Sequence, residues 1–307
     1  MHKVLVTGGS GFLGSHVSDA LSARGYDVVI LDREHSPYLR PEQTMIVGDI
    51  LDTEIVEKAI QGCESVFHFA GIADIAMASD NPLETVKVNI VGTTQVLEAA
   101  RANAVRRFVL ASSVYVYSNQ GMFYRSTKQA CEQLTQDYQE VFDLPYTILR
   151  FGSLYGPRAG SDNAVRRMLQ EALRDGVISY QGTGNEVREY IHVHDAAETS
   201  CDILSPAYEN GIYHLMGHER MRTRDMLSMI KEMLGPDIEL RFNEGKKVGH
   251  YQQTPYSYAP RTGRRLIRDS YMDLGLGLLQ CTEELDQAGE CVENADTASA
   301  KPVKGIR

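Results

Sequence analysis

The chain has no surplus of positive charge. Its 31 lysines and arginines stand against 41 aspartates and glutamates, which gives the 307 residues a formal net charge of −10. Proteins that bind nucleic acids generally carry a basic footprint, so this balance argues against a nucleic-acid partner. An anionic ligand must then be held by local dipoles and a few well-placed arginines.

Cysteines are few, and long apolar runs are missing. The five cysteines are an odd number without metal-ligand spacing, which favours free thiols in a reducing compartment and no metal site. No segment reaches the roughly 18 apolar residues of a membrane span. The apolar run near the N-terminus is too short for a signal peptide. We therefore expect a cytoplasmic protein with no membrane partner.

Short apolar runs alternate with amphipathic stretches over the first half of the chain. The runs predict buried strands at 3–7, 27–31, 44–47, 65–69, 107–112 and 146–150. The stretches between them predict helices at 12–24, 52–61, 81–103 and 123–142. Near-continuous apolar strands that alternate with helices are typical of an α/β protein with a parallel sheet covered on both faces.

The pattern changes near residue 151, where loops become frequent. We expect a first domain over 1–155 and a smaller C-terminal substrate-binding domain over 156–281. The segment 187–205 is predicted to return to the first domain. The polar tail, 282–307, has no sustained period and is predicted to be disordered.

A glycine-rich turn joins the first predicted strand to the first predicted helix. The stretch "VLVTGGSGFLGSH" places Gly8, Gly11 and Gly14 around Phe12 and Leu13. Glycines permit a tight turn and close approach to a pyrophosphate, and the helix that follows supplies free N–H groups. This arrangement predicts a doubly wound, Rossmann-type sheet that binds a dinucleotide.

The second predicted strand ends at Asp32, about 20 residues after the glycines, where an acid accepts hydrogen bonds from an adenosine ribose. A carboxylate at this place repels a 2′-phosphate, so the sequence favours NAD over NADP. Arg33 beside it keeps NADP open as the weaker alternative.

The glycine spacing and several later motifs, in order, resemble the extended short-chain dehydrogenase/reductase family, and within it the NAD-dependent nucleotide-sugar epimerases and dehydratases. The motifs are "GDILD" (48–52), "FHFAG" (67–71), "VNIVGTTQVLEA" (88–99), "ASSVYVYS" (111–118), the pair Tyr124 and Lys128, "LRFGSLYGPR" (149–158) and "VREYIHVHDAA" (187–197). The resemblance covers 1–205 well and 206–281 loosely. It implies that the cofactor contacts Asp49, Ile50, Phe69, Ala70, Gly71 and Asn89.

Tyr124 and Lys128 lie four residues apart and so share one helix face. By themselves they would fit a solvated surface. The resemblance implies that Tyr124 is the acid/base, that Lys128 holds the nicotinamide ribose, and that Ser113 hydrogen-bonds the same sugar oxygen. A phenol has a pKa of about 10 in water, and we expect a nearby ammonium together with the positive nicotinamide ring to favour the phenolate.

The resemblance also implies anchors for the substrate, a nucleotide-diphosphate sugar. Arg188 matches the arginine that grips the pyrophosphate, and a guanidinium fork suits that task. Ser153 stands where relatives usually carry an asparagine. A second arginine is expected from "YAPRTGRR", with Arg261 as the first choice and Arg264 close behind.

Among the family's reactions, the residues favour epimerisation at C4 through a 4-keto intermediate. Val114 and Tyr115 stand where relatives that dehydrate or decarboxylate sugars carry acids, and neither is a carboxylate. A reductase or dehydrogenase of a sugar nucleotide or a small carbonyl compound remains the alternative. A 4,6-dehydratase or a nonenzymatic NAD-binding regulator ranks below it.

Two further expectations concern the surroundings of the site. Only "SNQGMF" joins Tyr117 to Tyr124, whereas relatives carry a longer loop that forms one wall of the sugar site. The identity of the sugar is therefore open. Relatives pair the helices that correspond to 81–103 and 123–142 across a two-fold axis, which predicts a homodimer.

Overall fold

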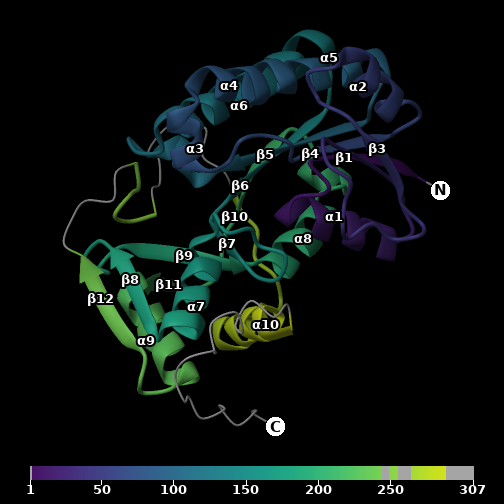
Figure 1. The fold of residues 1–307 in the computed structure, drawn as a ribbon. Helices are drawn as coiled ribbons and strands as arrows, with labels where there is room; N and C mark the ends of the chain where they lie inside the picture. Colours follow the sequence, from purple (N-terminus) through teal and green to yellow (C-terminus); the bar gives the residue numbers. More distant parts are fainter. Residues whose placement is uncertain (1, 244–248, 255–263, 288–307) are drawn as a thin grey trace.

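A large sheet covered by helices forms one lobe of the protein, and a smaller lobe lies below it in Figure 1. The structure is a computed structural model, and it describes residues 2–243, 249–254 and 264–287. Arg261 and most of the predicted tail lie outside the described residues. No helix among the described residues is long and apolar enough to cross a membrane.

In the described part of the chain, eight strands form the large sheet in the order β13-β10-β6-β5-β4-β1-β2-β3, and each neighbouring pair is parallel. Their bounds are β1 (Lys3–Thr7), β2 (Asp27–Asp32), β3 (Thr44–Val47), β4 (Ser65–His68), β5 (Arg107–Ser113), β6 (Tyr146–Phe151), β10 (Gly211–Leu215) and β13 (Arg264–Arg265). The order reverses between β1 and β4, where such sheets bind their ligands. The predicted fold class is confirmed, and β10 and β13 extend the six predicted strands.

Helices cover both faces of this sheet (Figure 1). One face carries α1 (Phe12–Ala23) and α8 (Val193–Asp202), which pack against each other. The other carries α2 (Thr53–Ile60), α5 (Thr93–Ala102) and α6 (Met122–Phe142). Each face has its own core, because side chains of a strand alternate between faces: Val4 and Val6 pack with α1, and Leu5 with α2 and α5.

The predicted helix at 81–103 is interrupted. The structure has α4 (Pro82–Val86), a π-helical segment Lys87–Gly92, and then α5, preceded by the short α3 (Ile75–Asp80). The last residue of the π-helical segment, Gly92, packs closely against Ile50, because an added Cβ would lie 2.5 Å from Cδ1 of Ile50. Such bulges are frequent at functional sites, and this one carries Asn89.

Among the described residues, the smaller lobe is built from two small sheets and three helices. One sheet has the order β11-β9-β7 and the other pairs β12 with β8. The bounds are β7 (Ser153–Tyr155), β8 (Val177–Gln181), β9 (Val187–His192), β11 (Arg220–Arg222), β12 (Glu239–Asn243), α7 (Ala164–Asp175), α9 (Thr223–Leu234) and α10 (Leu274–Gln287). Short 3₁₀ helices occupy Val114–Tyr117 and Pro206–Tyr208.

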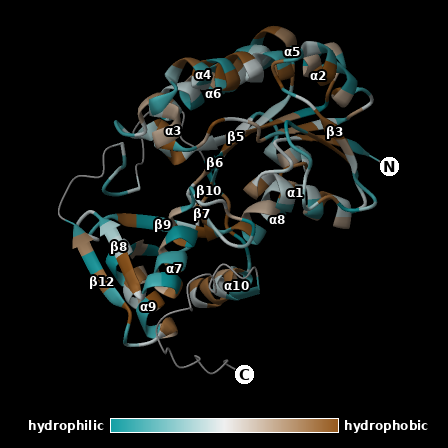
Figure 2. Cartoon of the chain, viewed as in Figure 1, coloured by the Kyte–Doolittle hydropathy of each residue, from teal (hydrophilic) through white to brown (hydrophobic). Residues whose placement is uncertain are grey.

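Two segments differ from their predicted placement. Within 187–205, strand β9 joins the sheet of the smaller lobe, and only α8 lies against the first domain. The tail was predicted to be disordered from 282, but α10 continues to Gln287, because Cys281 and Leu285 are buried in the apolar cluster of the smaller lobe. Figure 2 shows hydrophobic residues along this helix.

Candidate active site

The glycine turn after β1 is closely packed against its neighbours. Gly8 has a φ of +73°, and an added Cβ there would lie 2.5 Å from the backbone nitrogen of Ala70. A Cβ at Gly14 would lie 2.1 Å from the carbonyl oxygen of Gly8. In the described part of the chain no side chain caps α1, and its first turn holds no acid. The exposed N–H groups therefore fit an anionic pyrophosphate.

The predicted adenosine contacts follow the neighbouring strands β2 and β3. Asp32 Oδ2 accepts a hydrogen bond of 2.9 Å from the backbone N–H of Ser10, so it ties the end of β2 to the glycine turn. Arg33 beside it is exposed. Asp49 and the buried Ile50 follow β3. Asp49 Oδ1 accepts a hydrogen bond of 3.0 Å from the backbone N–H of Leu51.

Asn89 connects the loop after β4 to α6. Its Oδ1 accepts from the N–H of Ile72 at 2.7 Å, and its Nδ2 donates to Thr127 Oγ1 at 3.0 Å. A Cβ at Gly71 would lie 2.9 Å from Asn89 Oδ1 and 3.9 Å from Lys128 Nζ. The other predicted residues of this strand end, Phe69 and Ala70, directly precede Gly71. These contacts hold the loop beside Lys128.

The structure brings Ser113, Tyr124 and Lys128 together. Ser113 ends β5, and its side chain lies near the phenol of Tyr124 in the first turn of α6. Lys128 lies one turn further along, is buried, and donates to the carbonyl oxygen of Ala111 at 2.8 Å. The arrangement supplies a phenol, a hydroxyl and an ammonium at the carboxyl edge of the sheet.

Burial dominates the titration of both ionisable groups. It raises the pKa of Tyr124 to about 12, against a smaller lowering effect from the nearby Ser113 hydroxyl. Burial also lowers the pKa of Lys128. Among the described residues, desolvation of the phenol therefore outweighs the groups that lower the Tyr124 pKa, and it keeps the phenol protonated at neutral pH. The nicotinamide ring, the other group expected to favour the phenolate, would come with the cofactor.

The predicted phosphate anchors lie on two strands of the smaller lobe. Arg188 is on β9 and Ser153 on β7, and Tyr251 touches both. The guanidinium carbon of Arg188 is 4.2 Å from the centroid of the Tyr251 ring, and the side chain of Ser153 lies near the Tyr251 hydroxyl. Arg261 lies outside the described residues, and Arg264 is exposed in the edge strand β13.

A buried network behind α6 escaped the sequence analysis. Glu132 Oε1 accepts from Ser112 Oγ at 2.5 Å and from Arg150 Nε at 2.9 Å. The Arg150 guanidinium also contacts the Tyr117 hydroxyl, which is 3.0 Å from His214 Nε2. The available signal was the position of Glu132, four residues after the lysine of the Tyr-x-x-x-Lys pair and therefore on the same helix face.

His68 is a buried core residue, as its strand position predicts. Thr7 Oγ1 lies 2.7 Å from its Nδ1 and Thr93 Oγ1 lies 2.9 Å from its Nε2. Burial lowers its pKa to about 3, so it stays neutral. The described residues contain no group of histidines, cysteines or carboxylates that could hold a metal ion.

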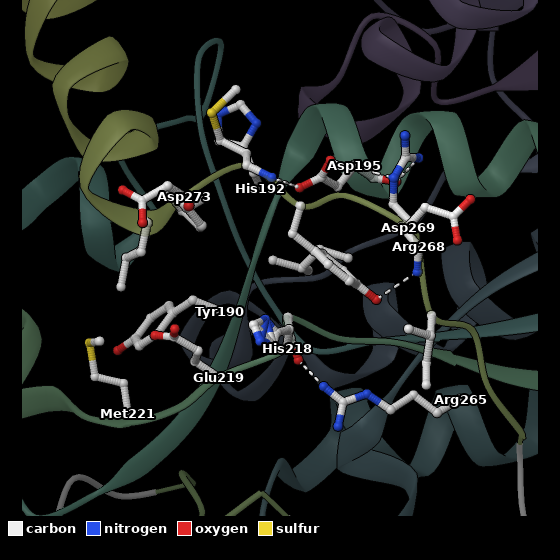
Figure 3. A pocket seen from close by; sticks show the side chains of 17 residues that line it. Tyr190, His192, Asp195, His218, Glu219, Met221, Arg265, Arg268, Asp269 and Asp273 are labelled. Atoms are coloured by element: carbon white, nitrogen blue, oxygen red, sulfur yellow. Dashed lines mark hydrogen bonds and ion pairs between the residues drawn. The ribbon is translucent and has the colours of Figure 1, made fainter.

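A separate cavity of about 560 Å³ lies beside β9, lined by residues that include Tyr190, Asp195, Arg265 and Arg268 (Figure 3). Arg268 pairs with Asp195 at 3.6 Å, and Arg265 donates to the carbonyl of Gly217. None of the predicted site residues that the structure describes lines this cavity.

The comparison with known families finds one that covers most of the chain. The sequence model of the NAD dependent epimerase/dehydratase family matches residues 4–214. This confirms the resemblance drawn from the motifs and the prediction of NAD as the cofactor.

Individual relatives differ in their reactions. UDP-glucuronic acid decarboxylase 4 of Arabidopsis thaliana is 25% identical over 281 residues, which are 82% of this chain and 62% of that one. The structure is similar to UDP-glucose 4-epimerase of Thermus thermophilus in complex with NAD, with a TM-score of 0.79, 25% identity, and coverage of 93% and 99% of the two chains. It is also similar to UDP-glucuronic acid 4-epimerase of Bacillus cereus in complex with UDP-glucuronic acid and NAD, with a TM-score of 0.82, 25% identity and the same coverage.

Proposed function

The chain belongs to the NAD dependent epimerase/dehydratase family, and from that premise we propose that it epimerises the sugar of a nucleotide-diphosphate sugar at C4 through a 4-keto intermediate. The observation that carries this proposal is the placement of Ser113, at the end of β5, near Tyr124, with Lys128 one turn further along α6. Oxidation of a sugar alcohol needs a base at the departing hydroxyl proton, and Tyr124 is the candidate.

NAD would be held by the glycine turn Gly8–Gly14, by Asp32 and by Lys128, and it would accept the hydride from C4. Tyr124 would take the C4 hydroxyl proton as the carbonyl forms, and would return it after the hydride has been delivered to the other face. Ser113 would donate a hydrogen bond to the same oxygen, which carries partial negative charge during the step. The positive charge of the nicotinamide ring would favour the phenolate of Tyr124, and Lys128 would bind the cofactor ribose.

The residues next to Ser113 support epimerisation over elimination or decarboxylation. Val114 is buried and apolar, and Tyr115 is hydrogen-bonded to His250 at 2.8 Å. Neither residue is a carboxylate, the group that the dehydrating and decarboxylating relatives are expected to use. Net oxidation or reduction of a sugar nucleotide is the second candidate, because it uses the same three residues.

Exposed apolar side chains on the helical face support a homodimer. They lie on α3, on α4, in the π-helical segment and on α6: Met77, Leu83, Val86, Val91, Phe123, Val141 and Phe142. Leu83 is 68% exposed and Val141 66%, which is unusual for residues on a face without a partner. We place the dimer axis on this face and the protein in the cytoplasm.

The substitution Tyr124→Phe tests the proposed chemistry. The ring and its packing remain, but the proton carrier is lost, so turnover of UDP-sugars should fall by a factor of about 10³ or more. NAD binding, measured by calorimetry, should change less than twofold. Phe123→Tyr is the matched control, because it alters an exposed ring one residue away. Unchanged turnover in the Tyr124→Phe protein would exclude the mechanism.

A further inference from the structure

The chain between Tyr117 and Tyr124 is a tight turn that cannot reach far over the site. Six residues join the two tyrosines, and two consecutive ones have left-handed backbone angles: φ is +93° at Gly121 and +47° at Met122. The wall that a longer loop would supply must come from another part of the chain.

The segment Gly249–Thr254, from the C-terminal part of the chain, lies against this turn. The N–H of Gly121 donates to the carbonyl oxygen of Gly249 at 2.8 Å. Gly249 has a φ of +81°, and an added Cβ would lie 3.1 Å from both Met122 Sδ and Ile75 Cγ2. A glycine is therefore needed for this close approach.

The same segment is fixed to β9 at its other end. The N–H of Val187 donates to the carbonyl oxygen of Gln252 at 2.8 Å, and Val187 forms an isolated parallel bridge with Gln253. Tyr251 and Thr254 are 5% and 4% exposed. The segment thus spans from the entry of α6 to the strand that carries Arg188.

Two side chains of the segment face the two ends of the predicted substrate site. At the Tyr124 end, His250 Nδ1 lies 2.8 Å from the Tyr115 hydroxyl, and the Tyr115 ring is 6.1 Å from the Tyr124 ring. At the phosphate end, the Tyr251 ring is 4.2 Å from the Arg188 guanidinium carbon. The rings of Tyr115 and Tyr251 are 4.7 Å apart and close the gap between the two ends.

We propose that Gly249–Thr254 forms the wall of the sugar site in place of the missing loop, and that the hydrogen-bonded pair of Tyr115 and His250 determines which hexose is accepted. This inference rests on the proposed function, because it takes Tyr124 to mark the position of the sugar. A hexose hydroxyl in contact with Tyr124 brings the rest of the ring within reach of Tyr115. The hydrogen bond between Tyr115 and His250 holds one donor and one acceptor in fixed directions beside the hexose. Polar groups in fixed directions discriminate sharply between the substituents of a sugar ring.

The test measures binding of two sugar nucleotides that differ in one substituent of the hexose, UDP-glucose and UDP-glucuronic acid, with UDP alone as the reference. Dissociation constants are determined by calorimetry on the NAD-loaded full chain and on its Tyr115→Phe and His250→Ala variants. We expect the ratio of the two sugar-nucleotide constants to move at least fivefold in both variants, and the constant for UDP to move less than twofold. His250→Asn keeps a hydrogen-bonding group near the Nδ1 position and should restore part of the discrimination.

The exposed His218 supplies the matched control, and His218→Ala should leave the ratio unchanged. A ratio that stays within twofold in Tyr115→Phe and His250→Ala overturns the inference. Equal weakening of both sugar nucleotides and of UDP overturns it as well, because it indicates a general loss of structure. Turnover is followed separately by NMR. If the ratio of the two sugar-nucleotide constants shifts but no epimerisation is observed, the proposed function is contradicted. The role of Gly249–Thr254 as the wall of the sugar site is then still supported.

Discussion

At the scale of single residues, buried histidines make the stability of the protein sensitive to acid. Burial lowers the pKa of His16, His192 and His214 to about 4 in each case. The rings of His16 and His192 each lie 4.9 Å from the ring of His194, at the junction of α1 with the end of β9. Protonation of these neighbouring histidines places positive charges next to one another and next to Arg158.

The sign of the effect follows from the lowered pKa values. Between about pH 6.5 and pH 4 the unfolded chain binds protons at these histidines and the folded chain does not. Stability is therefore complete above pH 6.5 and is lost as the pH falls toward 4, at up to about 1.4 kcal/mol per pH unit for each histidine. We predict that His192→Gln reduces this slope by about that amount, measured by urea unfolding at pH 7, 6 and 5. The exposed His218→Gln should leave the slope unchanged, and equal slopes in all three proteins would contradict the account.

The candidate catalytic residues were easier to predict than the residues that support them. Ser113, Tyr124 and Lys128 were predicted from the ordered motifs that resemble the family, and they lie at the end of β5 and in the first two turns of α6. Glu132, Arg150 and His214 could not be predicted, because their contacts join residues that are far apart in the sequence and no local pattern encodes the pairing.

At the scale of elements, helix α6 carries the candidate catalytic pair and is anchored by one buried ion pair. Glu132 and Arg150 are 5% and 5% exposed, and Glu132 also binds Ser112, the neighbour of Ser113. The pair therefore connects α6 to β5 and β6. Removal of one partner leaves the other as an unpaired buried charge, which lowers the free energy of unfolding by about 3–5 kcal/mol.

We predict that Glu132→Gln lowers the free energy of unfolding by about that amount in urea titrations. Glu140→Gln, at an exposed position of the same helix, should change it by less than about 0.5 kcal/mol. The double variant Glu132→Gln with Arg150→Met should recover part of the loss, because it removes the uncompensated guanidinium. A loss of less than 1 kcal/mol in Glu132→Gln would show that the pair does not anchor α6.

Element boundaries were predicted least well where packing overrides local pattern. The apolar period of 81–103 is compatible with both α and π geometry, so the interruption at Lys87–Gly92 was not visible. Similarly, the polar composition after residue 281 concealed Leu285, whose burial extends α10. Both differences arise from contacts with other elements rather than from the residues' own preferences.

At the scale of the whole molecule, alternation of apolar strands and helices was enough to predict the large sheet. The smaller lobe was predicted only in outline. Its sheets pair strands that are far apart in the sequence, such as β7 with β9 and β8 with β12. In addition, short and half-exposed strands show little apolar pattern in the sequence. The proposed wall at Gly249–Thr254 likewise depends on a contact between two segments that are far apart in the sequence. The shortness of the loop before Tyr124 did not indicate which segment would make this contact.

The proposed dimer gives a prediction about assembly. Leu83 and Val91 are exposed on the helical face, and a glutamate at both positions would place charges in a buried apolar interface. Leu83→Glu with Val91→Glu should therefore convert a dimer into a monomer in multi-angle light scattering. Leu276→Glu, an exposed position on α10 at the opposite side of the molecule in Figure 1, should remain dimeric. A wild-type monomer would contradict the proposal.

The central claim is that hydride leaves C4 of the sugar and returns to the same carbon. The most direct measurement is incubation of the NAD-loaded protein with UDP-glucose and UDP-glucuronic acid deuterated at C4, followed by NMR. The account predicts the C4 epimer with deuterium retained at C4, no deuterium in the solvent, and no net absorbance change at about 340 nm, because the cofactor is regenerated in each cycle. A product that has lost water or carbon dioxide, or a stoichiometric accumulation of reduced cofactor, would contradict it.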